Sequence, residues 1–246
     1  MDDKVDKIQE IKQPLLHHLV ELRSRLVKSL AIIFILFVVA YIFADTIYNF
    51  LVQPYADAVA GEEGRRLIFT ALHETFFTYL KVSLFASIFI ALPYILTQLW
   101  IFIAPGLYKR EKTFVMPLLI SSAILFYAGV AFAFFVVSPI ILNFFIAAAP
   151  DSIQIMTDIN KYLDFVLKLF FAFGFAFEIP VATFLLINTG ITNKESLRKI
   201  RPYLIIAFFV LAMLLTPPDI FSQLFLAIPM WLLFEIGLLI SRDPKD

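Results

Sequence analysis

The clearest candidate for chemistry is Glu178, a carboxylate in the middle of a long apolar run. An ionisable side chain at membrane depth is costly unless it is paired, hydrated or protonated, so it is a functional candidate. Pro180 leaves the carbonyl of Ala176 without its helical partner, which favours local hydration of the carboxyl. The alternative is a protonated glutamate that only joins two helices by a hydrogen bond.

Two further carboxylates, Glu21 and Glu111, lie among basic residues near the ends of apolar runs. Glu21 stands four residues before Arg25, which is the spacing of an ion pair on one helix face. Glu111 follows Lys109 and Arg110 in a short loop. Spacing alone indicates ordinary surface charges at both positions, because exposed ion pairs usually contribute little.

The sequence lacks the residues that most enzymes and metal centres need. It has no cysteine and only three histidines, two of which are adjacent and would point in different directions around a helix. None of the patterns HExxH, GxSxG and GxxxxGK(S/T), typical of metalloproteases, hydrolases and nucleotide-binding proteins, is present. We therefore expect no enzymatic activity, no metal, no cofactor and no nucleic-acid partner.

Long apolar stretches place these candidates in a lipid bilayer. Apolar residues make up 61% of the chain and the mean hydropathy is +0.88, which is typical of membrane proteins. About 20 apolar residues in a helix cross a hydrocarbon core of roughly 30 Å. We expect an all-α integral membrane protein, one domain over residues 1–246, with six transmembrane helices. The six stretches are 26–43, 76–102, 115–137, 163–187, 203–216 and 221–240.

Basic residues are distributed unevenly around this predicted bundle. Fifteen of the 20 Lys and Arg residues lie at or before the start of the first stretch, in the second-to-third and fourth-to-fifth loops, or after the sixth. Cytoplasmic loops carry such an excess, so both termini are expected in the cytoplasm. Leucines at positions 15, 19, 22 and 26 recur at helical spacing, which predicts an amphipathic helix over about 14–25 on that membrane surface.

Prolines and a short fifth stretch predict an irregular bundle. Proline within a helix favours a kink, so we expect a concave arrangement. The prolines concerned are Pro93, Pro117, Pro180 and Pro229. The fifth stretch gives only about 21 Å of helix at 1.5 Å per residue, so the turn near Asp219 would lie below the outer membrane surface. Apolar parts of both external loops are expected to cap the outer end.

Other residues inside the stretches have structural interpretations. Asp164 and Lys168 are four residues apart and are expected to pair with each other, while Lys81 extends to the outer interface. The seven glycines include none spaced as GxxxG within a stretch. Close backbone contact through small residues is therefore not expected to be the main packing device.

Five segments, in order along the chain, together resemble the TatC family, the polytopic core subunit of twin-arginine protein translocation. They are 18–26 (HLVELRSRL), 102–111 (FIAPGLYKRE), 125–127 (LFY), 172–180 (AFGFAFEIP) and 215–229, which contains LTPPD, FSQ and AIP. The resemblance covers nearly the whole chain on a frame of six spans with a cytoplasmic N-terminus.

The resemblance implies a function and a set of site residues. The family binds signal peptides with paired arginines on folded cargo and assembles with TatA-like and TatB-like single-span proteins. It does so in the bacterial cytoplasmic (inner) membrane, driven by proton-motive force, and self-association in the complex is possible. The residues that match the signal-peptide site are Glu21, Arg23, Phe102, Pro105, Tyr108 and Glu111. Glu178 matches a buried glutamate of the concave face, and Met213, Thr216 and Gln223 match a polar patch that receives a partner's helix.

A proton-coupled secondary transporter is the alternative that Glu178 and the kinked helices leave open. Such transporters commonly contain repeated halves with interrupted helices in corresponding positions. No such repeat is visible here, and the strongest motifs lie on the cytoplasmic side. A purely structural membrane scaffold is the third interpretation.

Overall fold

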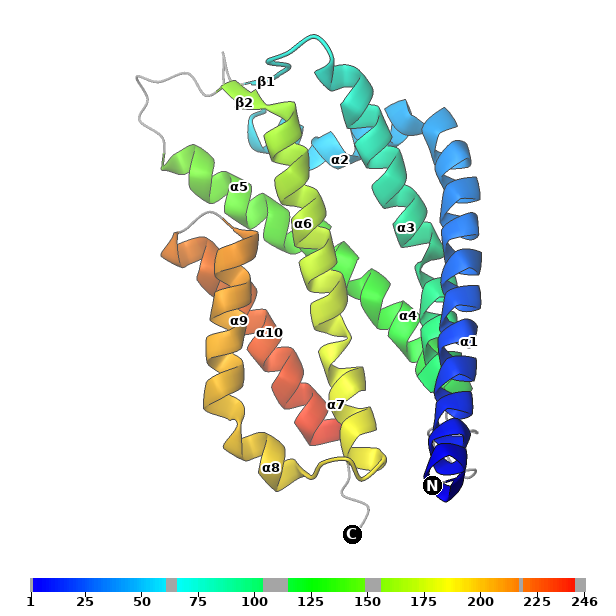
Figure 1. Cartoon of the computed structure of the whole chain (residues 1–246). Coiled ribbons are helices and arrows are strands. Elements are labelled where there is room, and N and C mark those ends of the chain that lie inside the picture. Colours follow the sequence, from blue (N-terminus) through cyan, green and yellow to red (C-terminus); the bar gives the residue numbers. More distant parts are fainter. Residues whose placement is uncertain (1, 61–65, 104–114, 149–155, 217–218, 242–246) are drawn as a thin grey trace.

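The computed structural model describes residues 2–60, 66–103, 115–148, 156–216 and 219–241 (Figure 1). Within these ranges, side chains are described except at residues 2–19, 66, 99–103 and 115–116. The elements are α1 (Asp2–Ile42), α2 (Ala44–Ala58), β1 (Arg66–Ile68), α3 (Glu74–Ile103), α4 (Val115–Phe132), the π turn η3 (Ala133–Val137), α5 (Ser138–Ala147), β2 (Met156–Asp158), α6 (Ile159–Phe177), α7 (Ile179–Asn188), α8 (Lys194–Lys199), α9 (Arg201–Leu215) and α10 (Ile220–Ile240).

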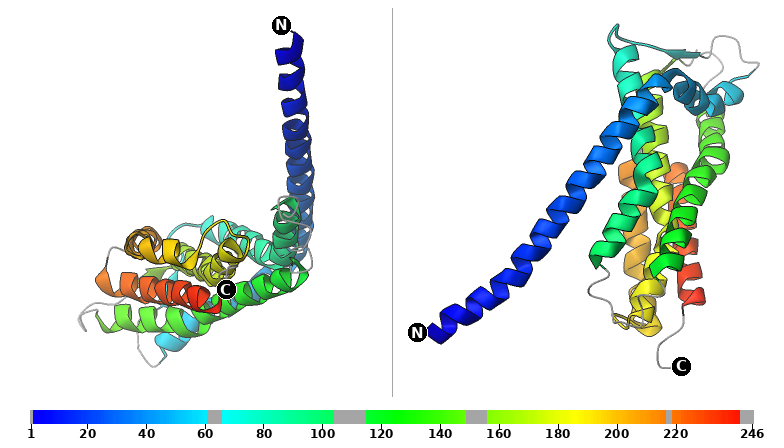
Figure 2. Two further views of the ribbon diagram at one scale, coloured as in Figure 1. Left: turned by 90° about the horizontal axis from the view of Figure 1, so that it is seen from below. Right: turned by 90° about the vertical axis from the view of Figure 1, so that its right-hand side faces the viewer.

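α1 is one continuous helix that joins the predicted amphipathic segment to the first span. Its C-terminal part runs beside α3, and its N-terminal part extends away from the other helices (Figure 2). Large apolar side chains on α1, such as Leu26 and Phe34, remain exposed on the protein. In a bilayer these side chains would contact lipid, which accounts for a hydrophobic helix with so little buried surface.

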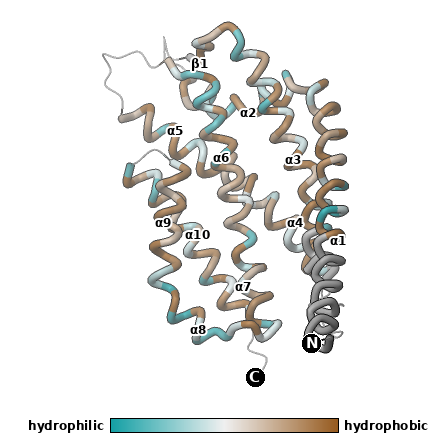
Figure 3. The backbone as a smooth tube through the Cα atoms, in the orientation of Figure 1, coloured by the Kyte–Doolittle hydropathy of each residue, from teal (hydrophilic) through white to brown (hydrophobic). Residues whose placement is uncertain are grey.

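The described helices have the apolar length that a membrane protein requires. Five segments are long and apolar enough to cross a bilayer, and α9 is a shorter apolar helix. The five are Val20–Ile42, Glu74–Gln98, Pro117–Ala147, Ile159–Asn188 and Ile220–Ile240. Hydrophobic residues dominate along the helices, and hydrophilic ones gather at α8 and near β1 (Figure 3). The predicted class, an all-α membrane protein, is confirmed.

The third span changes its helical register where it approaches the outer cap. The N–H of Ser138 donates to the carbonyl of Ala133, five residues earlier, which produces the π turn. Pro139 follows directly and has no N–H to continue the α-helical pattern. α4, η3 and α5 therefore form one long irregular rod that crosses obliquely behind α6 (Figure 1).

α6 forms the centre of the core and packs closely against α4. A Cβ atom on Gly129 would lie less than 3.0 Å from the backbone of Phe173, and one on Gly174 would meet the ring of Phe126. Small residues were not expected to be the main packing device, yet at this helix pair two glycines allow a close approach. GxxxG spacing identifies two glycines on one helix, whereas here each helix contributes one glycine to the contact.

A small cap covers the end of the bundle opposite to α8 (Figure 1). β1 and β2 pair in parallel, with Leu67 opposite Thr157, so the segment after α2 is joined to the segment after α5. The hydroxyl of Tyr55 in α2 lies 3.0 Å from Oγ1 of Thr157. The hydroxyl of Tyr162 donates to the backbone carbonyl of Leu51 at 2.9 Å. These bonds hold α2 and β2 against the start of α6.

Asp164 does not pair with Lys168 as the sequence spacing suggested. Its Oδ1 atom lies 2.7 Å from Nζ of Lys81 on α3. The same ammonium group lies 3.4 Å from Oδ1 of Asn160. A spacing of four residues places two side chains on one helix face, but α3 runs beside this face of α6 and provides a cation within reach of Asp164. Lys168 has no ion pair among the residues that the structure describes.

Candidate functional site

The cytoplasmic end predicted for α1 holds a carboxylate already bound to a guanidinium group. Nε and Nη2 of Arg25 lie 3.1 Å and 2.5 Å from Oε1 of Glu21. Nη1 of Arg25 donates to Oε1 of Gln98 in α3 at 3.1 Å. The side chain of Glu21 is 28% exposed, so its carboxylate is partly desolvated but still accessible. This arrangement fixes Glu21 beside the end of α3, where the second span begins to leave the membrane.

The structure describes only part of the predicted signal-peptide site. Arg23 is exposed on α1, two residues from Glu21. Phe102 lies in the last turn of α3, and its side chain is outside the described atoms. Pro105, Tyr108 and Glu111 lie outside the described residues, so their roles stay predictions.

Glu178 lies at a break in the fourth span. α6 ends at Phe177, Glu178 is the capping residue, and α7 starts at Ile179. The N–H of Glu178 donates to the carbonyl of Phe175 at 3.1 Å, which tightens the last turn of α6. Pro180 in the first turn of α7 supplies no N–H. The sequence therefore places the carboxyl beside a helix end rather than within an unbroken helix.

The carboxyl group of Glu178 is held from one side only. Oγ of Ser122, a fully buried residue of α4, lies 2.5 Å from Oε2 of Glu178. Oε1 of Glu178 is buried and has no hydrogen-bond partner among the described residues. A buried polar oxygen without a partner is unfavourable and is often found at functional sites. The second oxygen is thus available to bind a donor that enters this region.

The predicted partner-helix patch lies around the short α9–α10 hairpin. Met213 is 50% exposed, whereas Thr216 is 6% exposed and its hydroxyl donates to the carbonyl of Ala212 at 2.8 Å. Gln223 is half-buried in the first turn of α10, close in sequence to Asp219, which caps that helix. Met213 and Gln223 can therefore meet another helix directly, while the Thr216 hydroxyl is already used within α9.

Sequence reasoning missed the two residues that position the glutamates, Gln98 and Ser122. Both are polar residues within apolar stretches, which was the available signal. Helical periodicity within one segment cannot identify a contact between segments, so their partners became evident only in the folded chain.

A family model supports the resemblance to the TatC family that the sequence motifs indicate. The model described as "Sec-independent protein translocase protein (TatC)" matches residues 17–229. The chain belongs to the TatC family. The matched range includes Glu21, Glu178 and the α9–α10 hairpin, so every predicted site lies within the TatC homology.

Curated TatC proteins are similar to this chain along almost all of their length. The proteins named Sec-independent protein translocase protein TatC from Azotobacter chroococcum mcd 1 and Escherichia coli K12 are 54% and 48% identical to it. The first match covers 91% of this chain and 87% of the relative, and the second covers 95% and 90%. The TatC protein of Haemophilus influenzae is 50% identical over 236 residues.

Two solved TatC structures have the same fold. A crystal structure described as the twin-arginine translocase receptor TatC superposes with a TM-score of 0.81 at 36% identity, covering 90% of this chain and 96% of that one. The structure of the receptor in the detergent DDM gives a TM-score of 0.83, with 92% and 99% covered. The prediction of a twin-arginine translocase core subunit is confirmed at the level of the TatC family, whose role is protein transport rather than catalysis.

Proposed function

We propose that this chain is the signal-peptide receptor and assembly core of a twin-arginine translocase, with Glu21 as one of its arginine-binding residues. The observation that carries the proposal is the contact between Glu21 and the guanidinium of Arg25, with two nitrogens on one carboxylate oxygen. A carboxylate in this partly desolvated position suits a planar guanidinium better than a compact ammonium. Arg25 occupies it in the chain alone, and an arginine of the signal peptide would share or replace this contact.

The second arginine of the signal would bind Glu111. This residue follows Pro105 and Tyr108 in the sequence after α3, and α3 packs along α1, which carries Glu21. Arg23, Phe102, Pro105 and Tyr108 would shape the surface around the two carboxylates. The proposal for these residues depends on the TatC motif FIAPGLYKRE at 102–111.

The orientation we propose has six spans in the inner membrane of a bacterium, with this site and both termini on the cytoplasmic side. The arrangement in Figure 1 supports it, because the N-terminal part of α1, the basic helix α8 and the end of α10 lie at one end of the molecule. The β1–β2 cap lies at the opposite end. An excess of Lys and Arg favours the cytoplasmic side.

Glu178 and the α9–α10 hairpin would bind the other components of the translocase. Oε1 of Glu178, which has no hydrogen-bond partner in the described part of the chain, is suited to a donor from the signal peptide or from a partner's helix. Met213 and Gln223, with Thr216 behind them, would receive TatA-like and TatB-like single-span helices. Copies of the chain would associate within the assembled complex, and proton-motive force would drive transport.

Retention of the purified protein on an immobilised signal peptide tests this proposal. A peptide with paired arginines should retain the protein, and the same peptide with paired lysines should not. A protein that binds both peptides equally, at low salt only, would contradict the proposal, because diffuse attraction between charges is screened by salt.

A further inference from the structure

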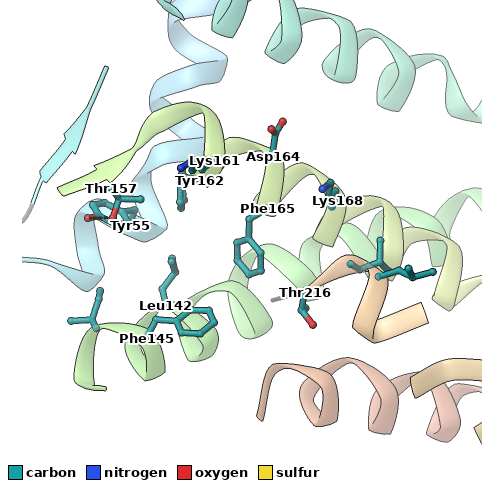
Figure 4. Close-up of a pocket in the computed structure, with 13 residues that line it drawn as sticks. Tyr55, Leu142, Phe145, Thr157, Lys161, Tyr162, Asp164, Phe165, Lys168 and Thr216 are labelled. Carbon is teal, nitrogen blue, oxygen red and sulfur yellow. Dashed lines mark hydrogen bonds between the residues drawn. The ribbon is translucent and has the colours of Figure 1, made fainter. Parts of the chain in front are cut away.

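A pocket of about 520 Å³ lies on the outer half of the molecule, between α5, α6 and the end of α9 (Figure 4). Its apolar wall includes Leu142, Phe145 and Phe165, and Phe165 points into the space between the helices. Charged groups enter from one side of α6, where Lys161, Asp164 and Lys168 line the pocket. The pocket therefore combines an apolar interior with two cations and one carboxylate on one wall.

Lys168 shares the pocket wall with a carboxylate that pairs with another cation. This carboxylate, Asp164, also lines the pocket, but its Oδ1 atom lies 2.7 Å from Nζ of Lys81 on α3. Lys168 is exposed, has no ion pair among the described residues and lies about 14 Å along α6 from Ile159, at 1.5 Å per residue. A lysine at such depth extends toward the interface and requires an anion or water there.

Two further donors lie at the outer rim of the pocket. Lys161 is exposed there, although Asp158 offsets part of its charge. The hydroxyl of Thr157 accepts a hydrogen bond from Tyr55, so its own hydrogen can be donated into the pocket. The donors follow α6 from the membrane surface toward Lys168.

The short α9 leaves room for lipid above it. α9 has 15 residues, which give about 22 Å of helix against a hydrocarbon core of roughly 30 Å. Its end, at Leu215 and Thr216, forms the floor of the pocket, well below the start of α6 in Figure 1. The outer leaflet is therefore expected to be locally thinner over this hairpin. A lipid headgroup there would lie at the level of Lys168.

We propose that this pocket binds one anionic glycerophospholipid of the outer leaflet, with its phosphate on Lys168 and an acyl chain along Phe165 and Phe145. The apolar wall distinguishes a lipid from a free anion, which would leave that wall exposed. Lys161 and Thr157 would contact the glycerol and headgroup oxygens. The site depends on the membrane orientation proposed above but not on signal recognition, and its test contains no signal peptide.

Native mass spectrometry of the delipidated protein in neutral detergent, titrated with phosphatidylglycerol or phosphatidylcholine, tests the proposal. We expect one tightly held phosphatidylglycerol per chain and weaker binding of phosphatidylcholine. Lys168→Gln should weaken phosphatidylglycerol binding about tenfold, the loss of one charge-assisted contact. Lys168→Arg should retain it, and Lys161→Gln should cause a smaller loss. The matched control is Lys199→Gln, which removes an exposed cation from α8 and should have no effect.

Four results would overturn the proposal. Unchanged binding in folded Lys168→Gln would show that the lysine does not contact lipid. Equal losses in Lys168→Gln and Lys199→Gln would indicate diffuse attraction only. Displacement of the lipid by millimolar inorganic phosphate would indicate a free-anion site. Unchanged lipid binding together with lost cross-linking of a single-span partner would assign Lys168 to an acidic partner helix. If Lys168→Gln fails to fold, Lys161→Gln is compared with Lys199→Gln instead, and equal lipid binding by these two variants would overturn the proposal.

Discussion

The hydroxyl of Ser122 in α4 lies 2.5 Å from Oε2 of Glu178, at the break between α6 and α7. The two residues are 56 positions apart, so this bond joins the third and fourth spans. Because Oε1 of Glu178 has no described partner, Ser122 alone orients the carboxyl among the described side chains.

Replacing Ser122 with Ala should destabilise the protein by about 1–3 kcal/mol, because both oxygens of a partly buried carboxyl then lack a donor. Denaturant unfolding in detergent measures the change. Ser121→Ala is the matched control, since the hydroxyl of Ser121 donates to the carbonyl of Leu118 in its own helix. Its effect should stay within about 0.5 kcal/mol. Equal losses of unfolding free energy in the two variants would show that the hydrogen bond to Glu178 stabilises the protein no more than the bond of Ser121 within its own helix.

A cysteine at Glu178 should react with a water-soluble maleimide added from the cytoplasmic side. The native chain has no cysteine, so the introduced thiol is the only target. Ser87→Cys, at a fully buried position of α3, should stay unlabelled. Complete protection of the cysteine at position 178 in protein without partners would indicate a sealed structural role for this site.

Glu111→Ala should weaken the binding of a twin-arginine peptide at least tenfold, because a charge-assisted hydrogen bond contributes about 1.5–3 kcal/mol. Glu111→Gln should recover only part of the affinity, since the amide keeps the shape but not the charge. Fluorescence anisotropy with arginine and lysine peptides measures both. Glu195→Ala removes an exposed carboxylate from α8 and is the control. A small loss of affinity for both peptides that disappears at high salt would show that Glu111 contributes only non-specific electrostatic attraction.

Cysteines at Met213 and Gln223 should cross-link to a single-span partner in membranes more efficiently than a cysteine at Thr216. Met213 is 50% exposed and Thr216 only 6%, so only the first presents its side chain to a neighbouring helix. Leu211→Cys, 46% exposed on a different side of α9, controls for random encounters. Immunoblotting of the cross-linked products gives the efficiency at each position. Equal cross-linking at positions 211 and 213 would contradict a specific partner-binding patch.

Asp158, which caps α6 outside the membrane, should make stability depend on pH at the acidic end. The hydrogen bond from the Lys161 N–H, followed by that from Thr70, holds the pKa of Asp158 below its ordinary value of 3.8. A lowered pKa means that the carboxylate stabilises the fold fully above pH 3.8, and that this contribution is lost as the pH falls through the lower folded value.

Asp158→Asn should retain the helix cap but lose this acid dependence, whereas Asp158→Ala should cost about 0.5–2 kcal/mol at neutral pH. Thermal unfolding between pH 3 and pH 7 separates the two variants. A wild-type protein whose acid dependence matches that of Asp158→Asn would show that the capping carboxylate makes no contribution.

The outline of the fold follows from local sequence. Each apolar stretch is largely helical in the structure, because in a bilayer backbone hydrogen bonds must be satisfied within the segment. The short α9 was also predicted, because prolines on either side limit its length. The pairing of Glu21 with Arg25 followed from their spacing on one helix.

Contacts between helices could not be predicted in this way. The residues Gln98 and Ser122, which position Glu21 and Glu178, lie on other helices, and helical periodicity gives no information about which helices meet. For the same reason Asp164 was assigned to Lys168, whereas α3 brings Lys81 closer. The close contact of Gly129 with α6 depends equally on how two separate segments pack.

The sequence by itself thus determined the class of protein, the likeness to TatC and the carboxylates that could bind cations. The tertiary structure decided how those carboxylates are held and which charged residues pair, as the contact of Asp164 with Lys81 shows. The physical reason is that membrane insertion depends on the hydrophobicity of each segment alone, whereas ion pairs and buried hydrogen bonds depend on distances of a few ångströms between segments.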